Sequence, residues 1–133
     1  MIAEQIEATE GQLARHDSAA ARAMGKRLRA AREAFEQVVY FVAGHTKATP
    51  NAVFAGSVPY LMLAGNVVAG WQMARALLVA EDRLAAGEDA AFMAAKIATA
   101  RFYAEHLLSK VPGLRDAIVE GADSVTGLAL ESF

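Results

Sequence analysis

The chain has 133 residues, of which 55% are hydrophobic and 21% charged, and its formal net charge is −2. This length suffices for one domain with a core and is too short for two ordinary domains, and the apolar content excludes disorder as the overall state. The small net charge gives no reason to expect a nucleic-acid partner, and the absence of cysteine excludes disulfides, thiolate metal sites and a cysteine nucleophile.

The first predicted element is a helix over about residues 2–15, because Ile2, Ile6 and Leu13 recur at near-helical spacing. No basic segment followed by an apolar one occurs at the N-terminus, so the sequence predicts no signal peptide. Together with the absence of cysteine, this predicts a cytoplasmic protein.

The second predicted element is a long amphipathic helix that ends at about residue 43. Either Asp17 or Ser18 has a side chain suited to cap its start. Apolar residues then follow in steps of three and four, which is the pattern of a helix with one buried face. They are Met24, Leu28, Ala31, Phe35, Val38, Val39 and Val42.

The centre of the chain carries no charged side chain between Lys47 and Arg75. Thr49-Pro50 is a typical helix start, and a helix beginning there could continue to residue 86, with Gly87 as its stop. Pro59 lies inside this helix, so it either bends the helix or splits off a first turn.

This uncharged stretch is about 40 Å long as a helix, which is long enough to cross a bilayer. Four polar residues interrupt it, and an amide facing lipid near its middle, at Asn66, would be costly. Its glycines remove side-chain bulk and allow close helix packing. The polar residues are Asn51, Ser57, Asn66 and Gln72, and the glycines are Gly56, Gly65 and Gly70. We therefore expect a buried core helix wrapped by its neighbours and no membrane contact; a small membrane protein built around residues 52–74 is the alternative.

The remaining sequence predicts two further helices. Glu88-Asp89 places negative charge at the start of the first, which ends near Lys110 before Pro112. The second covers roughly residues 114–130 and is interrupted or weakened by Gly121 and Gly127. The sequence thus predicts an all-α protein, with residues 1–133 forming a single helical bundle of about four helices around a central, nearly uncharged helix.

No catalytic, cofactor-binding or metal-binding residue is predicted. None of the three histidines has a glutamate three residues before it, so the Glu-x-x-His pattern of di-iron bundles is missing. No Gly-rich phosphate loop and no Gly-x-Ser-x-Gly elbow occurs either.

One cluster of charge is a candidate contact site. Arg22, Lys26 and Arg29 fall on one stripe of the second helix, where they could receive a phosphate-bearing ligand or an acidic partner surface. The alternative is an ordinary solvated face opposite the core stripe. Trp71 and the Phe102-Tyr103 pair could in addition line a shared contact.

Residues 59–84 and 91–125 resemble the C-terminal domain appended to one branch of the FAD-dependent acyl-CoA dehydrogenases, the branch that includes 3-methylthiopropanoyl-CoA dehydrogenase. The resemblance extends over roughly residues 19–130. The shared features are Tyr60-Leu61, Gly65, Gly70-Trp71, the run of Lys96, Ala100, Arg101, Phe102 and Tyr103, and the closing turn from Gly121 to Ser124.

The resemblance implies a parent enzyme that introduces a double bond α,β to a CoA thioester. In that family the catalytic carboxylate and the flavin and CoA contacts lie mainly in a preceding core, and no segment of this chain resembles that core. It therefore implies a detached accessory domain that is inactive alone, with FAD bound in the parent and no cofactor in this chain. The expected partners are the parent's catalytic core, a second copy of the chain, or both, which predicts a homo-oligomer.

Two other functions remain open from the sequence. A free-standing scaffold or granule-coat protein, similar to phasins, would share the alanine-rich amphipathic helices. The domain could also hold an acyl chain or part of CoA, although we expect no such binding by the isolated domain.

Overall fold

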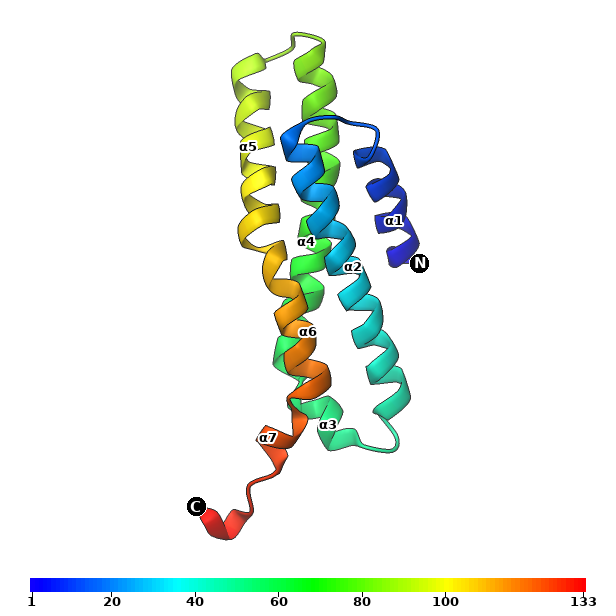
Figure 1. The fold of residues 1–133 in the computed structure, drawn as a ribbon, viewed down its shortest axis with the longest axis vertical. Coiled ribbons are helices and arrows are strands. Elements are labelled where there is room, and N and C mark those ends of the chain that lie inside the picture. Colours follow the sequence, from blue (N-terminus) through cyan, green and yellow to red (C-terminus); the bar gives the residue numbers. More distant parts are fainter.

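The computed structural model describes all 133 residues and is entirely helical, with no strand. Figure 1 shows the helices packed side by side as an elongated bundle. They are α1 (Ile2–Leu13), α2 (Ala19–His45), α3 (Pro50–Ala55), α4 (Ser57–Ala85), α5 (Ala90–His106), α6 (Val111–Glu120) and α7 (Ala122–Thr126). Short 3₁₀ turns cover Leu108–Lys110 and Leu130–Ser132. The all-α prediction is confirmed.

Helix α4 is the centre of the bundle, because it contacts α1, α2, α5 and α6. Helices α5 and α6 follow one another along the same side, joined by the 3₁₀ turn, whereas α1 runs beside only part of the length of α2 (Figure 1). The bundle therefore has three long columns, formed by α2, α4 and the α5–α6 pair, with α1 as a shorter fourth.

The core lies between these columns and is built from aliphatic side chains and many alanines. Alanine favours helix and lets helix backbones approach closely. The fully buried larger side chains are Ile6, Leu13, Met24, Leu28, Val38, Leu63, Val67, Leu77, Leu108, Val111 and Ile118. Four of the seven predicted core positions of α2 are buried, Phe35 and Val42 are half-buried, and Val39 is exposed, with 38% of its surface accessible.

Ser18 is the cap of α2, which decides between the two predicted candidates. Its Oγ accepts a hydrogen bond from the backbone N–H of Ala21 at 3.0 Å, and its hydroxyl donates to Glu81 of α4. The same residue therefore starts one helix and ties it to another. Helix α2 ends at His45, two residues beyond the expected end.

Pro59 splits the predicted central helix rather than bending it. The chain forms α3, breaks at Gly56, and restarts as α4 with Pro59 in its first turn, where a missing N–H leaves no intrahelical hydrogen bond unmade. Gly56 also permits close packing, because a Cβ there would lie 3.2 Å from Cγ2 of Ile118.

The turn between α4 and α5 and the C-terminal boundaries differ in detail from the prediction. Gly87 and Asp89 both have positive φ, of 76° and 44°, so the turn uses the left-handed region twice before α5 begins. Helix α6 begins at Val111, three residues earlier than expected, with Pro112 in its first turn. The break at Gly121 is confirmed, but the α-helix ends at Thr126 and does not reach residue 130.

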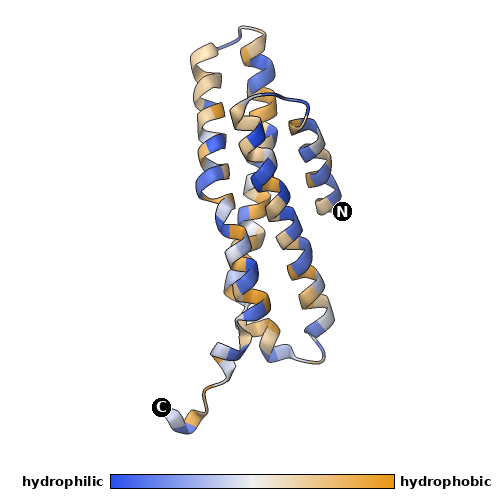
Figure 2. Ribbon diagram, in the orientation of Figure 1, coloured by the Kyte–Doolittle hydropathy of each residue, from blue (hydrophilic) through white to orange (hydrophobic).

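The wrapping of α4 by its neighbours is incomplete. Residues that recur every three or four positions along its first half stay exposed on the side away from the core. We call this stripe the outer face of α4; it consists of Val58, Leu61, Met62, Gly65 and Val68. Leu61 is 73% exposed and Val58 68%. Phe54 on α3, a helix that is mostly hydrophobic in Figure 2, is exposed as well.

By length and composition alone, α4 is one helix that could cross a membrane, and 33% of its most apolar window is buried inside the bundle. Core helices of soluble proteins satisfy the same criterion. The arrangement of the other helices therefore has to decide whether α4 is a buried core helix or a membrane-spanning helix.

Candidate functional site: an interaction surface on the central helix

The polar residue near the middle of α4 is used inside the bundle. The side-chain amide of Asn66 donates to the backbone carbonyl of Leu107 at 2.9 Å and accepts from the Tyr103 hydroxyl at 2.9 Å. Burial raises the pKa of Tyr103, so its hydroxyl stays protonated and available as a donor. These bonds join α4 to the end of α5 and turn the amide away from the outer face.

Trp71 is directed to α1 rather than to the aromatic pair on α5. Its indole N–H donates to Oγ1 of Thr9 at 2.9 Å, and the Thr9 hydroxyl donates to the carbonyl of Gln5. Phe102 instead stacks on His106, with ring centroids 4.5 Å apart. Trp71 and Tyr103 therefore hydrogen-bond to different helices, and a shared contact lined by Trp71 and Phe102-Tyr103 stays a prediction. The burial of Thr9 was not predicted, although Thr9 lies on the same helical stripe as its buried neighbours Ile6 and Leu13.

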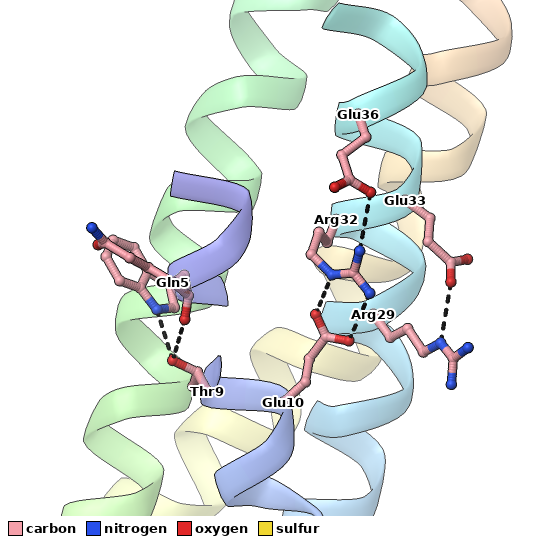
Figure 3. A network of polar contacts seen from close by, with 8 residues as sticks. Gln5, Thr9, Glu10, Arg29, Arg32, Glu33 and Glu36 are labelled. Atoms are coloured by element: carbon pink, nitrogen blue, oxygen red, sulfur yellow. Dashed lines mark hydrogen bonds and ion pairs between the residues drawn. The ribbon is translucent and has the colours of Figure 1, made fainter. Parts of the chain in front are cut away.

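The strongest ion pair lies between α1 and α2. Figure 3 shows the guanidinium of Arg32 facing the carboxylate of Glu10, with N–O distances of 2.5 and 3.2 Å, and reaching Glu36 at 3.0 Å. Both partners of the Glu10 pair are largely buried, and this hydrogen bond raises the pKa of Arg32 above its ordinary value. This pair was not predicted from the sequence, because its two partners lie on different helices.

The predicted basic stripe is exposed, and carboxylates neutralise two of its three members. Arg22 pairs with Asp17 at 3.0 Å, and Arg29 pairs with Glu33 at 3.1 Å, as Figure 3 shows for Arg29. Lys26 forms no ion pair. Lys26 and Arg29 border a hollow that Glu7 and Glu10 also line, whereas Arg22 lies outside it. The stripe does not converge on one anion-sized site, and its role as a contact for a ligand or a partner stays a prediction.

The histidines take structural positions in different parts of the bundle. Nε2 of His16 lies 3.3 Å from Oδ1 of Asp82, while Nδ1 lies 3.0 Å from the carbonyl of Gln12. His45 and His106 stack on Phe41 and Phe102 of their own helices. No group of three or more histidine and carboxylate side chains is placed to hold a metal ion.

These observations leave the outer face of α4 as the main unsatisfied surface. Apart from Gly65, its members are large apolar side chains that stay exposed, and no charged residue occurs on α4 before Arg75. A contiguous exposed apolar surface on a folded domain is typical of an interaction site.

Comparison with known proteins decides the family. Residues 2–129 match the family described as acetyl-CoA dehydrogenase C-terminal like. The chain belongs to this family. The matched range runs from α1 past the end of α7, so the whole bundle, and not a part of it, is the family's domain.

A curated relative agrees with this assignment. The chain is 41% identical over 129 residues to the C-terminal region of 3-methylmercaptopropionyl-CoA dehydrogenase from Ruegeria pomeroyi. This match covers 97% of the chain and 22% of the enzyme, so the chain spans less than a quarter of the relative's length. The resemblance inferred from the sequence is confirmed.

Proposed function

We propose that this chain is the C-terminal accessory domain of an FAD-dependent acyl-CoA dehydrogenase, an enzyme that forms the α,β double bond of an acyl-CoA thioester in the cytoplasm. Its role is to pack, through the outer face of α4, against the catalytic part of the enzyme, against a second copy of itself, or against both. The flavin and the catalytic carboxylate belong to the catalytic part, and this chain contributes binding surface.

The single observation that supports this role is the exposure of the outer face of α4. Leu61 and Met62 are 73% and 59% exposed in the bundle. Burying one such side chain fully is worth about 1.5–3 kcal/mol, so a partner that covers several of them gains enough to form a specific interface. No other helix carries as many exposed large apolar residues as α4.

A protein partner fits this face better than a bilayer does. The helices around α4 carry charged residues on their own outer sides, where lipid would have to lie if α4 crossed a membrane. These residues are Arg29, Glu33 and Glu36 on α2 and Lys96, Arg101 and Glu105 on α5. Charges facing hydrocarbon are costly, so a bundle that carries them on its outer sides favours a protein partner for the apolar face.

The test is a chimera of the Ruegeria pomeroyi dehydrogenase in which this chain replaces the matching C-terminal region. A variant with Leu61→Glu and Met62→Glu should dock on the order of 100-fold more weakly, because two apolar contacts are lost and two carboxylates would be buried. Limited proteolysis should then release the domain faster, and the melting temperature of the chimera should fall.

The matched control carries the same two carboxylates at exposed positions elsewhere, as Gln12→Glu with Ala98→Glu. It should behave like the unaltered chimera. The proposal would be contradicted if the α4 variant and this control were equally resistant to protease and equally stable.

A further inference from the structure

A second surface feature lies further along α4, where the helix faces the beginning of α5. A hollow of roughly 410 Å³ opens there between the two helices. Its lining residues are Gln72, Arg75, Ala76, Val79, Ala80, Arg83, Phe92, Met93 and Lys96. This volume lies within the range of small-molecule sites, which is about 300–1,000 Å³.

The hollow is basic and its charge is not compensated. Arg75, Arg83 and Lys96 line it together, and no acidic residue does. None of the three forms an ion pair, in contrast to Arg22, Arg29 and Arg32 on α2. The acidic pair at Glu88-Asp89 lies in the turn beyond the end of α4, outside the lining.

Aromatic rings hold two of these cations in place. The guanidinium of Arg75 lies over the Trp71 ring at 5.5 Å and also donates to Gln72 at 3.1 Å, and the ammonium of Lys96 lies over the Phe92 ring at 5.5 Å. A cation over a ring is positioned without being neutralised. Its charge and its N–H groups therefore remain available to an anion.

Apart from Gln72, the rest of the lining is apolar, and its larger part is accessible. Phe92 is 60% exposed and Val79 52%, and Ala76, Ala80 and Met93 complete the apolar wall. A ligand for this hollow needs both an anionic group for the three cations and an apolar group for this wall.

In contrast to the expectation from the sequence that the isolated domain binds no acyl chain or part of CoA, we infer that the hollow between α4 and α5 binds an organic phosphate, a molecule that joins a phosphate group to an apolar or aromatic group. Arginine matches phosphate because its planar guanidinium donates two parallel hydrogen bonds, and lysine adds a point charge. The small size of the hollow favours a small molecule over an acidic protein surface, which would need a larger contact area.

Trp71 is the only tryptophan of the chain and contacts one of the three cations, so it reports on the site directly. Titration of the 133-residue chain with hexyl phosphate at constant ionic strength should give a saturable change in its emission. Inorganic phosphate should bind at least tenfold more weakly, because it cannot use the apolar wall. No saturable change with hexyl phosphate, or an equal affinity for inorganic phosphate, would overturn the inference.

Two double variants localise the binding while leaving the Trp71–Arg75 contact intact. Arg83→Gln with Lys96→Gln should weaken hexyl phosphate binding at least tenfold. Lys26→Gln with Arg29→Gln removes the same amount of charge from the basic stripe of α2. This second variant should change the affinity for hexyl phosphate less than twofold. Circular dichroism confirms that both variants are folded. Equal weakening in the two variants would show nonspecific attraction and would contradict the assignment.

Further titrations identify the source of the phosphate group. Binding of hexyl phosphate from solution with no response to vesicles of phosphatidylcholine and phosphatidylglycerol supports a soluble ligand, whereas tighter binding to those vesicles supports a lipid headgroup. A hexaglutamate peptide that binds more tightly than either would overturn the inference in favour of an acidic protein partner.

Discussion

Asn66 is a polar side chain in an uncharged helix, and its two hydrogen bonds explain why it is tolerated there. The amide ties α4 to Leu107 and Tyr103 at the point where α5 gives way to a 3₁₀ turn. The Leu107 carbonyl accepts from both Asn66 and the Lys110 N–H. The sequence showed that this amide would be costly in lipid, but its partners lie about 40 positions away along the chain and could not be identified from spacing.

Replacement of Asn66 by leucine should destabilise the fold by about 1–2 kcal/mol, because the Tyr103 hydroxyl loses the nearer of its two acceptors and keeps only the Asn66 backbone carbonyl at 3.3 Å, and the Leu107 carbonyl loses one of two donors. Tyr103→Phe should cost about 1 kcal/mol alone and little more in the Asn66→Leu background. Urea unfolding of the two single variants and the double variant measures this coupling. If the two substitutions lowered the free energy of unfolding additively, the hydrogen bond between the Tyr103 hydroxyl and the Asn66 side chain would be contradicted.

His16 gives the fold a pH dependence at the junction of α1 and α2. Its pKa is raised above the ordinary value of 6.5, first by the hydrogen bond to the Gln12 carbonyl and then by Asp82. The protonated ring can donate from both nitrogens, so the folded state favours the charged form.

The contribution of His16 to stability should be fully present below about pH 6.5 and be lost as the pH rises through the raised pKa of the folded state. Since Asp82 is 76% exposed, the loss should stay below about 1 kcal/mol. Urea unfolding of the wild type and of His16→Asn between pH 5.5 and 8.5 tests this. The difference in free energy of unfolding between the two should shrink as the pH rises; a constant or growing difference would refute it.

At the scale of the elements, the glycines of α4 differ in what they do. Gly70 lies directly against Leu108, since a Cβ at this position would be only 2.4 Å from one of its methyl carbons. Gly65 has open space around it on the outer face. The sequence predicts close helix packing for these two glycines and for Gly56 before α4, and the structure confirms it for Gly56 and Gly70 but not for Gly65.

Gly70→Ala and Gly65→Ala should therefore change stability in opposite directions. Leu108 is fully buried and would have to shift, so Gly70→Ala should destabilise by about 1–3 kcal/mol. Gly65→Ala should stabilise by about 0.5–1 kcal/mol, because alanine is the better residue in an exposed helix interior. Thermal unfolding of both variants measures this, and a Gly70→Ala variant as stable as the wild type would show that α4 and the 3₁₀ turn do not pack this closely.

Helix boundaries were predictable where a single residue sets them. Ser18 starts α2, and Gly121 separates the last two helices, as local chemistry indicated. The end of α5 was less predictable. After His106 the chain forms a 3₁₀ turn and then continues as α6, which has Pro112 in its first turn and runs in line with α5. That arrangement depends on packing against α2 and α4, which no local pattern contains.

At the scale of the molecule, the fold class and the central position of α4 followed from the sequence, but its open side did not. A helix that is apolar around its whole circumference has no stripe that distinguishes a covered side from an exposed one. The short length of α1 and the line taken by α5 and α6 decide which residues of α4 stay uncovered (Figure 1).

The candidate sites show the same limit. The basic stripe of Arg22, Lys26 and Arg29 was visible because its members lie on one helix, yet the structure pairs two of them with carboxylates. The hollow of Arg75, Arg83 and Lys96 was missed because it requires the register between α4 and α5. Charge on a single helix was therefore a poor guide to charge that remains available to a ligand.

The most direct test of the docking role is sedimentation velocity of the isolated 133-residue chain over a wide range of concentrations. With the outer face of α4 uncovered, we predict concentration-dependent dimers that Leu61→Glu with Met62→Glu abolishes and Gln12→Glu with Ala98→Glu does not. Dimers that both variants leave unchanged would contradict the account, and a chain that stays monomeric at every concentration would contradict the docking of a second copy on this face.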